Sequence, residues 1–476
     1  MELTGLPNRT GLSAPAARPS RTRRALGFVA AAAIALTSIG PAAPPAAAQQ
    51  RGTGPSVIRD TEIENLLREY AAPILRAAGL AKQNVRVVVL NDRNFNAFVM
   101  DGRHIFINAG ALFDARTPNE IIGVFAHETG HLAGGHLLKL REQLARAQTA
   151  SIIALLLGAG AAVAGGGSGG AAAIMAPQAA IQRTLLAYVR TQEDAADHAG
   201  VKFLNATQQS SRGMIDLFKR LANDALFNSR YVDPYLQSHP MPQERVAALE
   251  TVAKQSPYYD VKDPPALQAR HDMIRAKLAG FLERPDTVAR RYPPSDTSMP
   301  ARYARAIAAY RHADLRNALA QIDGLIQAQP ANPYFQELKG QALLEAGRGV
   351  EAIAPLRRAA QLSNNAPLIQ VMLAQALISS NDPRTAEEAV GLLNSALARE
   401  PTISEAYEQL AMAYGRKGDL GRADLAAAQA ALNRGDLKTA RQIAARAKSR
   451  LPVGSPPWVR ANDITNDKPQ PANARN

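Results

Sequence analysis

The chain has 476 residues, with 55 lysines and arginines against 41 acidic residues, and it contains no cysteine. This length predicts two to three domains, and the lack of thiols excludes disulfide frameworks and thiolate zinc sites, so any metal must be bound by nitrogen and oxygen atoms. The formal net charge of +14 comes from basic residues spread along the chain rather than from a basic stripe with interleaved aromatic residues. We therefore expect no nucleic-acid partner.

The N-terminus has the pattern of a secretory signal. Four arginines between positions 18 and 24 precede an apolar run at 25–36, and small residues follow up to Ala48. This order predicts a signal peptide over residues 1–48 that is cleaved after Ala48. A retained membrane anchor is the alternative, which the short, alanine-rich run disfavours. We expect a protein exported from a bacterial cytoplasm.

The next region predicts a helix followed by three strands. A polar linker at 51–55 leads to an amphipathic helix over residues 60–78. Residues 85–90 are a predicted strand, and residues 96–108 a hairpin with an Asp-Gly turn. The strand before the following helix either accepts an extended peptide at a sheet edge or is purely structural, and the sequence leaves both open.

Residues 118–138 contain the motif His127-Glu128-Thr129-Gly130-His131 within an apolar pattern of helical spacing. Residues four apart lie one turn above each other on a helix, so His127 and His131 can offer two imidazole nitrogens to one metal ion. Glu128 lies beside the pair, where it can act as the general base for water. The alternative is a core helix without a metal, which would bury unpaired polar groups.

Residues 151–177 are apolar and rich in glycine, and each arm of this stretch is too short to span a bilayer. Three interpretations stay open for this stretch. The first is a buried helical hairpin and the second is a mobile flap over the active site. The third is a patch, over residues 151–176, that contacts a membrane or a nonpolar client.

A second helix is predicted over residues 181–204, and it carries Glu193 and Asp197 four residues apart on the same side. We expect Glu193 to be the third zinc ligand, contributed by a helix that crosses the first. Asp197 would accept a hydrogen bond from a ligand histidine and fix its tautomer. A solvated acidic face is the alternative. His136 lies nine residues after His127, about 180° around a continuous helix, so we expect it to point away from the metal.

Two prolines predict a non-helical loop around His239, and Arg245 opens the next helix. Such a stiffened loop can hold His239 over the site as a substrate contact, an oxyanion contact or a fourth metal ligand. A loop histidine with satisfied hydrogen bonds is the alternative.

These separated motifs resemble the M48 family of zinc metalloproteases over about residues 60–255. The resemblance implies that His127, His131 and Glu193 bind one Zn²⁺ ion, that Glu128 is the catalytic base, and that His239 caps the metal and keeps the enzyme latent. Asp197 and Arg245 fall on recurring positions of the family, and we count Arg245 with His239 among the catalytic residues.

From about residue 300, small and aromatic residues recur at intervals of 34 to 37 residues, as in the alanines at 318, 352, 389 and 423. This period is typical of tetratricopeptide repeats, which stack into a solenoid with a concave surface for a partner. We expect repeats over residues 300–458 with a single closing helix, and a disordered tail over 459–476. Residues 256–299 are a predicted connector with one helix over 265–282.

Together these features predict a mainly α protein. A zincin-like α+β peptidase domain with a small sheet, over residues 49–255, precedes the α-solenoid. With its signal peptide and repeats the chain is similar to the periplasmic BepA-type proteases, which act as protease and chaperone in outer-membrane protein quality control.

We accordingly expect an exported zinc endopeptidase of a Gram-negative periplasm. Its expected substrates are unfolded or misassembled envelope and outer-membrane proteins, which the repeats also assist as a chaperone, and the outer-membrane assembly machinery is a further expected partner. The alternative is a largely latent chaperone or adaptor, in which His239 keeps the zinc site closed.

Overall fold

The computed structural model describes residues 56–149, 169–227, 234–312, 314–380 and 382–466. The predicted signal peptide at 1–48 and most of the glycine-rich stretch at 151–177 lie outside these residues. The described chain is mainly helical, with one small mixed sheet followed by a run of paired helices. This is the fold class that we expected.

A four-stranded sheet and its covering helix open the peptidase part. Helix α1 (Thr61–Ala77) is capped at its N-terminus by Asp60, whose carboxylate accepts a hydrogen bond from the Ile63 backbone N–H. The strands β1 (Val57–Ile58), β2 (Arg86–Leu90), β3 (Ala97–Asp101) and β4 (His104–Asn108) lie in the order β1-β2-β4-β3. Strand β4 pairs antiparallel with β3 and parallel with β2. The predicted strand and hairpin are therefore confirmed.

Helix α3 (Pro118–Gly134) runs through the core of this part, preceded by the short helix α2 (Ala109–Asp114). Its first fourteen residues are all buried, in keeping with the apolar pattern around the histidine motif. Thr117 caps the N-terminus of α3, and Pro118 occupies the first turn, where its missing N–H is not needed.

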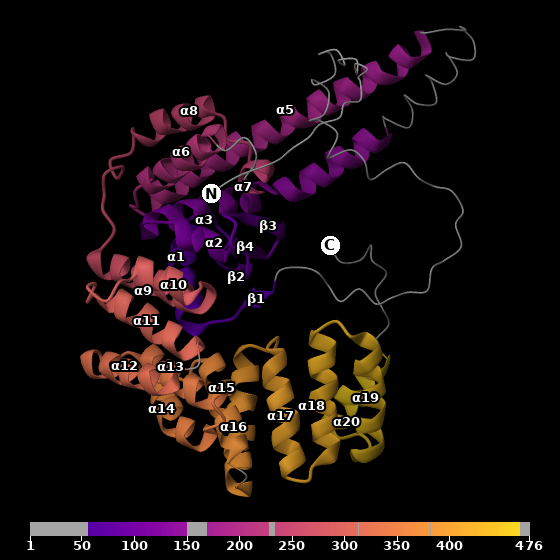
Figure 1. Ribbon diagram of the computed structural model, residues 1–476. Coiled ribbons are helices and arrows are strands. Elements are labelled where there is room, and N and C mark those ends of the chain that lie inside the picture. Colours follow the sequence, from indigo (N-terminus) through magenta and orange to yellow (C-terminus); the bar gives the residue numbers. More distant parts are fainter. Residues whose placement is uncertain (1–55, 150–168, 228–233, 313, 381, 467–476) are drawn as a thin grey trace, which may run out of the picture. The chain divides into compact units, whose positions relative to one another are not determined.

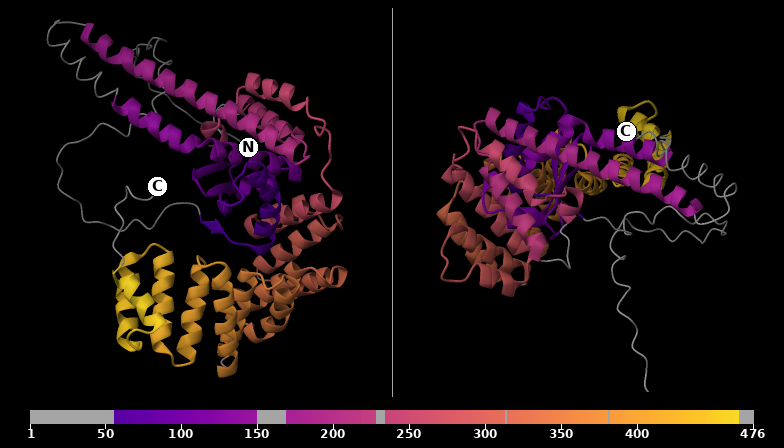
Figure 2. Two further views of the ribbon diagram at one scale, coloured as in Figure 1. Left: turned by 180° about the vertical axis from the view of Figure 1, so that it is seen from behind. Right: turned by 90° about the horizontal axis from the view of Figure 1, so that it is seen from above.

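Helix α3 packs against α5 (Gly169–Ala206) and α6 (Arg212–Phe227). Figures 1 and 2 show α5 projecting beyond the helices that pack against it. A side chain on Gly130 would collide with α5, since its Cβ would lie 2.7 Å from the Ala196 carbonyl oxygen. The two helix backbones therefore approach each other closely. The shorter helices α7 (Pro234–Ser238) and α8 (Gln243–Ala253) follow.

The connector contains the predicted helix, α9 (Pro265–Leu282), and a second helix that we did not expect, α10 (Pro285–Arg291).

Five helical pairs then follow one another in chain order (Figure 1): α11 (Met299–Arg311), α12 (Leu315–Ala328), α13 (Pro333–Glu345), α14 (Gly349–Leu362), α15 (Pro367–Ser379), α16 (Pro383–Arg399), α17 (Ser404–Arg416), α18 (Leu420–Asn433), α19 (Leu437–Arg450) and α20 (Pro456–Asn466). Gly347 and Gly418 supply the left-handed turn, with φ of 75° and 76°, that joins two helices of a pair.

Two expectations for the C-terminal end are wrong. We expected a single closing helix, but α19 and α20 form a further pair. We also expected disorder after Trp458, yet α20 continues to Asn466, because Ala461 and Ile464 bury their side chains against the preceding helices.

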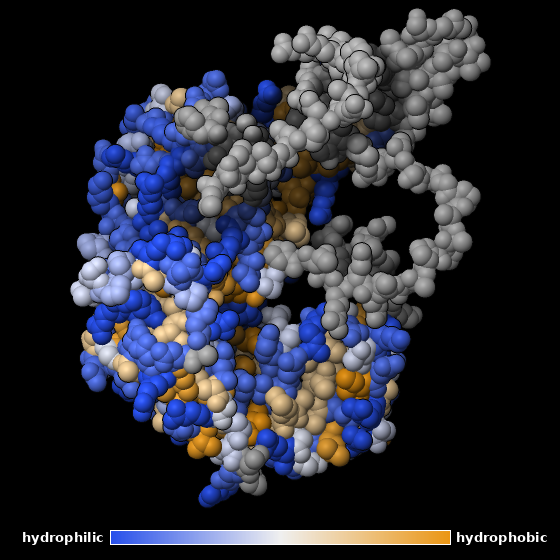
Figure 3. All heavy atoms as spheres, viewed as in Figure 1, coloured by the Kyte–Doolittle hydropathy of each residue, from blue (hydrophilic) through white to orange (hydrophobic). Residues whose placement is uncertain are grey.

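Hydrophilic residues cover most of the described surface in Figure 3, and apolar residues appear in seams between them. None of the helices in the described part of the chain combines the length and the apolar character needed to cross a membrane.

Candidate metal centre

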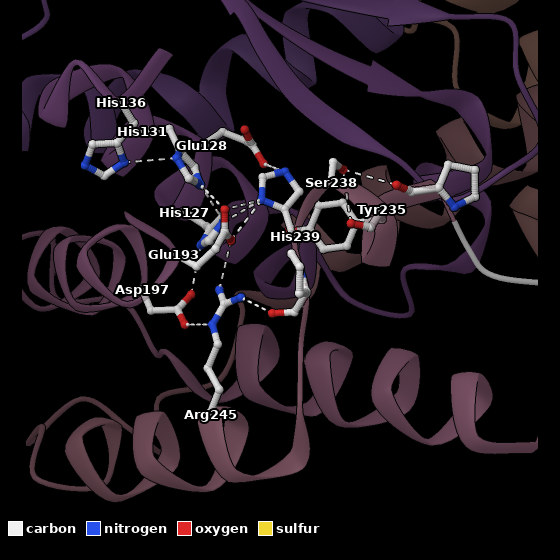
Figure 4. A network of polar contacts seen from close by, with 12 residues as sticks. His127, Glu128, His131, His136, Glu193, Asp197, Tyr235, Ser238, His239 and Arg245 are labelled. Atoms are coloured by element: carbon white, nitrogen blue, oxygen red, sulfur yellow. Dashed lines mark hydrogen bonds and ion pairs between the residues drawn. The ribbon is translucent and has the colours of Figure 1, made fainter. Parts of the chain in front are cut away.

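Helices α3 and α5 bring the predicted ligands together in the buried interior (Figure 4). The Nε2 atoms of His127 and His131 lie 3.1 Å apart. The two carboxylate oxygens of Glu193 lie 3.4 Å from these nitrogens, one oxygen on each imidazole. His239 adds a fourth donor, because its Nδ1 lies 3.0 Å from a Glu193 oxygen. The donor atoms of these four residues all lie within 4.8 Å of one another, which is close enough to hold one metal ion.

The charges around this cluster suit a divalent cation. Three buried carboxylates, on Glu128, Glu193 and Asp197, face a single buried guanidinium, that of Arg245. Their formal charges sum to −2. Neither carboxylate oxygen of Glu128 receives a hydrogen bond from the described residues, and its closest ionic partner is His239 Nε2 at 3.5 Å. A buried acceptor of this kind requires a partner, and a metal ion with its water would supply one.

The imidazole of His127 is oriented by Asp197, whose Oδ1 accepts a hydrogen bond of 2.8 Å from Nδ1. This contact leaves Nε2 free to face the cluster, as it must for metal binding. Burial disfavours the imidazolium, but the hydrogen bonds to Asp197 and Glu193 raise the pKa of His127 to about 10. The carboxylates around His127 thus stabilise a positive charge at this point, which is either a proton on the imidazole or, in place of that proton, a metal ion. Because Glu193 and Asp197 are both buried, the alternative of a solvated acidic face is excluded.

Burial lowers the pKa of His131 to about 4, more strongly than the nearby Glu193 raises it. This histidine is therefore neutral at physiological pH, and the neutral imidazole is the form that binds metals.

Arg245 fixes the loop that carries His239. The Arg245 guanidinium donates hydrogen bonds of 2.7 Å to Asp197 Oδ2 and to the Pro240 carbonyl oxygen, and it lies 3.2 Å from a Glu193 oxygen. Helix α7 ends at Ser238, and the His239 backbone N–H donates back to the Tyr235 carbonyl. The non-helical loop that we predicted therefore begins at His239 itself.

The donors thus come from one helix with two histidines, a second helix with Glu193 and Asp197, and the loop that carries His239. Residues 58–253 match the sequence model of peptidase family M48. This part of the chain belongs to peptidase family M48. The chain is thus a metalloendopeptidase, and the cluster of His127, His131 and Glu193 lies within the matched region.

Two curated relatives cover most of this M48 peptidase. The Beta-barrel assembly-enhancing protease of Escherichia coli (strain K12) is 22% identical over 416 residues, which are 86% of this chain and 83% of the relative. The protein of the same name from Yersinia pestis is 21% identical over the same shares of the two chains.

Among solved structures, the chain is similar to one titled MamA MSR-1 C2, with a TM-score of 0.30 and 16% identity over 35% of this chain and 93% of that one. It is also similar to YrrB, a tetratricopeptide protein with an unusual peptide-binding site, with a TM-score of 0.30 and 15% identity over 37% of this chain and 90% of that one.

One residue of the M48 peptidase lies elsewhere than we expected. We placed His136 on the far side of α3 by assuming a continuous helix, but α3 ends at Gly134, and Gly135 adopts a left-handed conformation with φ of 61°. The chain therefore turns, and His136 folds back until its Nδ1 lies 3.0 Å from His131 Nδ1. His136 is not among the clustered donors, but it contacts the back of a candidate ligand. The Gly134-Gly135 pair was the sequence signal for this turn.

Tyr235 is the residue that the sequence did not indicate. Its fully buried ring packs 4.7 Å, centroid to centroid, from the imidazole of His239 and contacts Phe95 and Phe218 on its other sides. The tyrosine thus packs against His239 on the side away from these two phenylalanines. No periodicity or motif in the sequence distinguishes it from an ordinary core aromatic residue.

Proposed function

We propose that this M48 peptidase is an exported, zinc-dependent endopeptidase that binds one zinc ion per chain and degrades misfolded or stalled envelope proteins in the periplasm. The observation that carries this proposal is the convergence of His127, His131 and Glu193 from two helices, with the carboxylate of Glu128 beside them. The similarity to proteins named Beta-barrel assembly-enhancing protease supports the compartment and the class of substrate.

The chain's own residues divide the work of peptide hydrolysis among them. A ligand set of two imidazoles and one carboxylate suits Zn²⁺, which when bound polarises the scissile carbonyl and acidifies water. Burial raises the pKa of Glu128 above its ordinary value, which favours its taking up a proton as a general base must. Glu128 takes a proton from the attacking water and delivers it to the leaving amine. Asp197 holds the His127 tautomer, and Arg245 acts as a positioning residue for Glu193 and the loop.

His239 makes the resting enzyme latent in this proposal. Its Nδ1 lies 3.0 and 3.1 Å from the two oxygens of Glu193, on the donor cluster itself. With a metal bound, an imidazole in this position would compete with a substrate carbonyl or water for the ion. The same observation favours the second candidate function, a largely latent chaperone or adaptor whose centre stays closed.

We further propose that the repeats (300–458, continued by α20) provide a binding surface for clients. The connector (256–299) joins these repeats to the catalytic part (49–255). Unfolded envelope and outer-membrane proteins are the proposed clients, with the outer-membrane assembly machinery as a further partner. Peripheral membrane contact through residues 151–176 belongs to the same proposal.

The replacement Glu128→Gln tests the mechanism. It removes the base but leaves His127, His131 and Glu193 in place, so cleavage of denatured casein should fall by a factor of about 10² to 10⁴ while the zinc content stays the same. The matched control is Glu142→Gln, since the Glu142 side chain is 54% exposed and lies outside the centre. Cleavage at the wild-type rate by Glu128→Gln would overturn the mechanism.

The replacement His239→Ala separates the two candidate functions. If the loop histidine caps an active centre, its removal should raise casein cleavage while zinc stays bound, and the surface variant His198→Ala should change nothing. Activity that stays negligible in both the wild-type protein and His239→Ala, with zinc present, would favour the adaptor.

A further inference from the structure

A second cavity lies apart from the metal centre. It has a volume of about 830 Å³, and none of the metal-centre residues lines it. Helix α1 and strands β1 and β2 form one wall, and the segments before α15 and α17 form the other. Apolar and charged residues both line the cavity, and the charged residues carry a net positive charge.

Arginines dominate the charge of this cavity. Five arginines and two glutamates line it, which gives a formal lining charge of +3. Both glutamates, Glu64 and Glu400, already pair with Arg59 at 2.6 and 2.7 Å. No carboxylate of the described residues pairs with the other four, Arg68, Arg76, Arg86 and Arg399. A cavity wall of low dielectric focuses the potential of such unpaired cations.

The same cavity contains an edge of the sheet. Strand β1 is the outermost strand beside β2, and in the described part of the chain it pairs with β2 alone. Its outward N–H and C=O groups are thus available to another strand. Val57 on this edge is 51% exposed, so its side chain is accessible to a bound segment.

We propose that this cavity binds an extended polypeptide segment rich in aspartate and glutamate. The segment adds its backbone to the edge of β1, and its carboxylates pair with the arginine forks, which match carboxylate geometry. Its apolar side chains cover Val57 and the neighbouring apolar lining. The unpaired strand edge distinguishes this occupant from an anionic lipid, which has no backbone to pair. The proposal goes beyond the peptidase function and does not depend on it, since the two sites share no residue.

Fluorescence anisotropy with a labelled twelve-residue peptide of alternating aspartate and valine tests the proposal. The protein is the full chain carrying Glu128→Gln, so that the probe is not cleaved. We expect saturable binding at 50 mM salt, and at least about tenfold weaker binding for the double variant Arg68→Glu/Arg76→Glu. The control Arg290→Glu/Arg384→Glu changes net charge equally at arginines that lie outside the cavity and whose side chains are 70% and 91% exposed. It should bind like the parent.

Further probes test the parts of the proposal separately. The same peptide with lysine in place of aspartate should not bind, and N-methylation of alternate residues should weaken binding if the backbone pairs with β1. Equal weakening by the cavity and control variants would overturn the assignment, because it would show attraction to the net charge alone. The proposal would also be overturned if the protein bound phosphatidylglycerol vesicles but not the peptide, and if the cavity variant Arg68→Glu/Arg76→Glu abolished the binding of these vesicles.

Discussion

His136 Nδ1 lies 3.0 Å from His131 Nδ1, so the imidazole nitrogen that faces away from the donor cluster is held by a second imidazole. Only one of these two nitrogens can donate. If His131 binds metal through Nε2, its proton lies on Nδ1, and His136 must accept that hydrogen bond. The two candidate ligand histidines therefore have different supports, a carboxylate for His127 and an imidazole for His131.

This contact predicts that His136→Leu lowers metal affinity by a factor of about 10 to 100, the usual cost of removing a group that orients a metal ligand. The replacement His136→Gln, which keeps an acceptor, should lose less. Zinc affinity is measured by competition with a chromogenic chelator. The melting temperature of the metal-free protein should stay nearly unchanged. If His136→Leu also lowered this melting temperature substantially, the result would show that His136 has only a packing role.

A substitution beside the contact provides an independent check. A Cβ on Gly134 would lie 2.1 Å from His136 Nε2, so Gly134→Ala must displace the imidazole without altering any donor residue. We expect the same loss of zinc affinity as for His136→Leu. The control is Gly391→Ala, where a Cβ meets nothing within 4 Å. Wild-type affinity in Gly134→Ala would refute the orienting role.

Arg245→Lys should lower kcat/KM by at least about tenfold. A single ammonium cannot reach Asp197, the Pro240 carbonyl and Glu193 together, and each lost hydrogen bond to a charged group is worth about 1.5–3 kcal/mol. Cleavage of a casein-derived peptide measures the effect. The control is Arg220→Lys, since Arg220 also donates two charged hydrogen bonds, both to Glu120 and away from the centre. Equal losses in both variants would indicate general destabilisation rather than mispositioning.

His271 makes stability depend on pH. It is buried, with Nδ1 3.2 Å from the Tyr70 hydroxyl and Nε2 3.1 Å from the Ala115 carbonyl oxygen. Burial lowers its pKa from 6.5 to about 4, so the unfolded chain binds this proton more readily. Its contribution to stability is therefore complete above pH 6.5 and is lost as the pH falls towards 4, by up to about 3 kcal/mol.

Urea denaturation between pH 7 and 4 measures this slope. His271→Asn should show a shallower decline in the free energy of unfolding over this range than the wild-type protein does. Parallel curves for the two proteins would contradict the assignment to His271.

Lys277→Met should destabilise the chain by about 3–5 kcal/mol, since it leaves the buried carboxylate of Glu62 and the partly buried one of Asp60 without their cation. The Lys277 ammonium lies 2.6 Å from Asp60 and 3.2 Å from Glu62, and Tyr303 donates a further hydrogen bond to Glu62. Thermal and urea unfolding measure the loss, and adding Glu62→Gln should restore part of it. Lys339→Met removes a partly exposed pair with Asp323 and should cost less than about 1 kcal/mol. Similar losses in the two lysine variants would show that burial does not determine the effect.

The elements that bring the candidate ligands together could be predicted because their signals are local. The apolar pattern of α3 and the four-residue spacings in α3 and α5 depend only on helical periodicity. His136 was misplaced for the same reason: the angular argument holds only while the helix continues, and Gly135 ends it. Local rules work until the backbone leaves the regular element.

Contacts between distant parts of the chain could not be predicted. Lys277 meets Asp60 across more than two hundred residues, and nothing in either neighbourhood identifies the partner. Tyr235 behind His239 is likewise indistinguishable in sequence from other core aromatic residues. The repeat period correctly gave the paired helices, but it could not show where the array ends, because terminal units depart from the pattern.

The close packing at Gly130 has a consequence for how the donor cluster is assembled. A Cβ there would lie 2.7 Å from the Ala196 carbonyl oxygen, so any larger residue would wedge the two ligand-bearing helices apart. Glu193 lies on α5 only three residues before Ala196, whereas His127 and His131 lie on α3 on either side of Gly130. The meeting of the two halves of the donor cluster thus depends on a residue with no side chain, which is not itself one of the clustered donors.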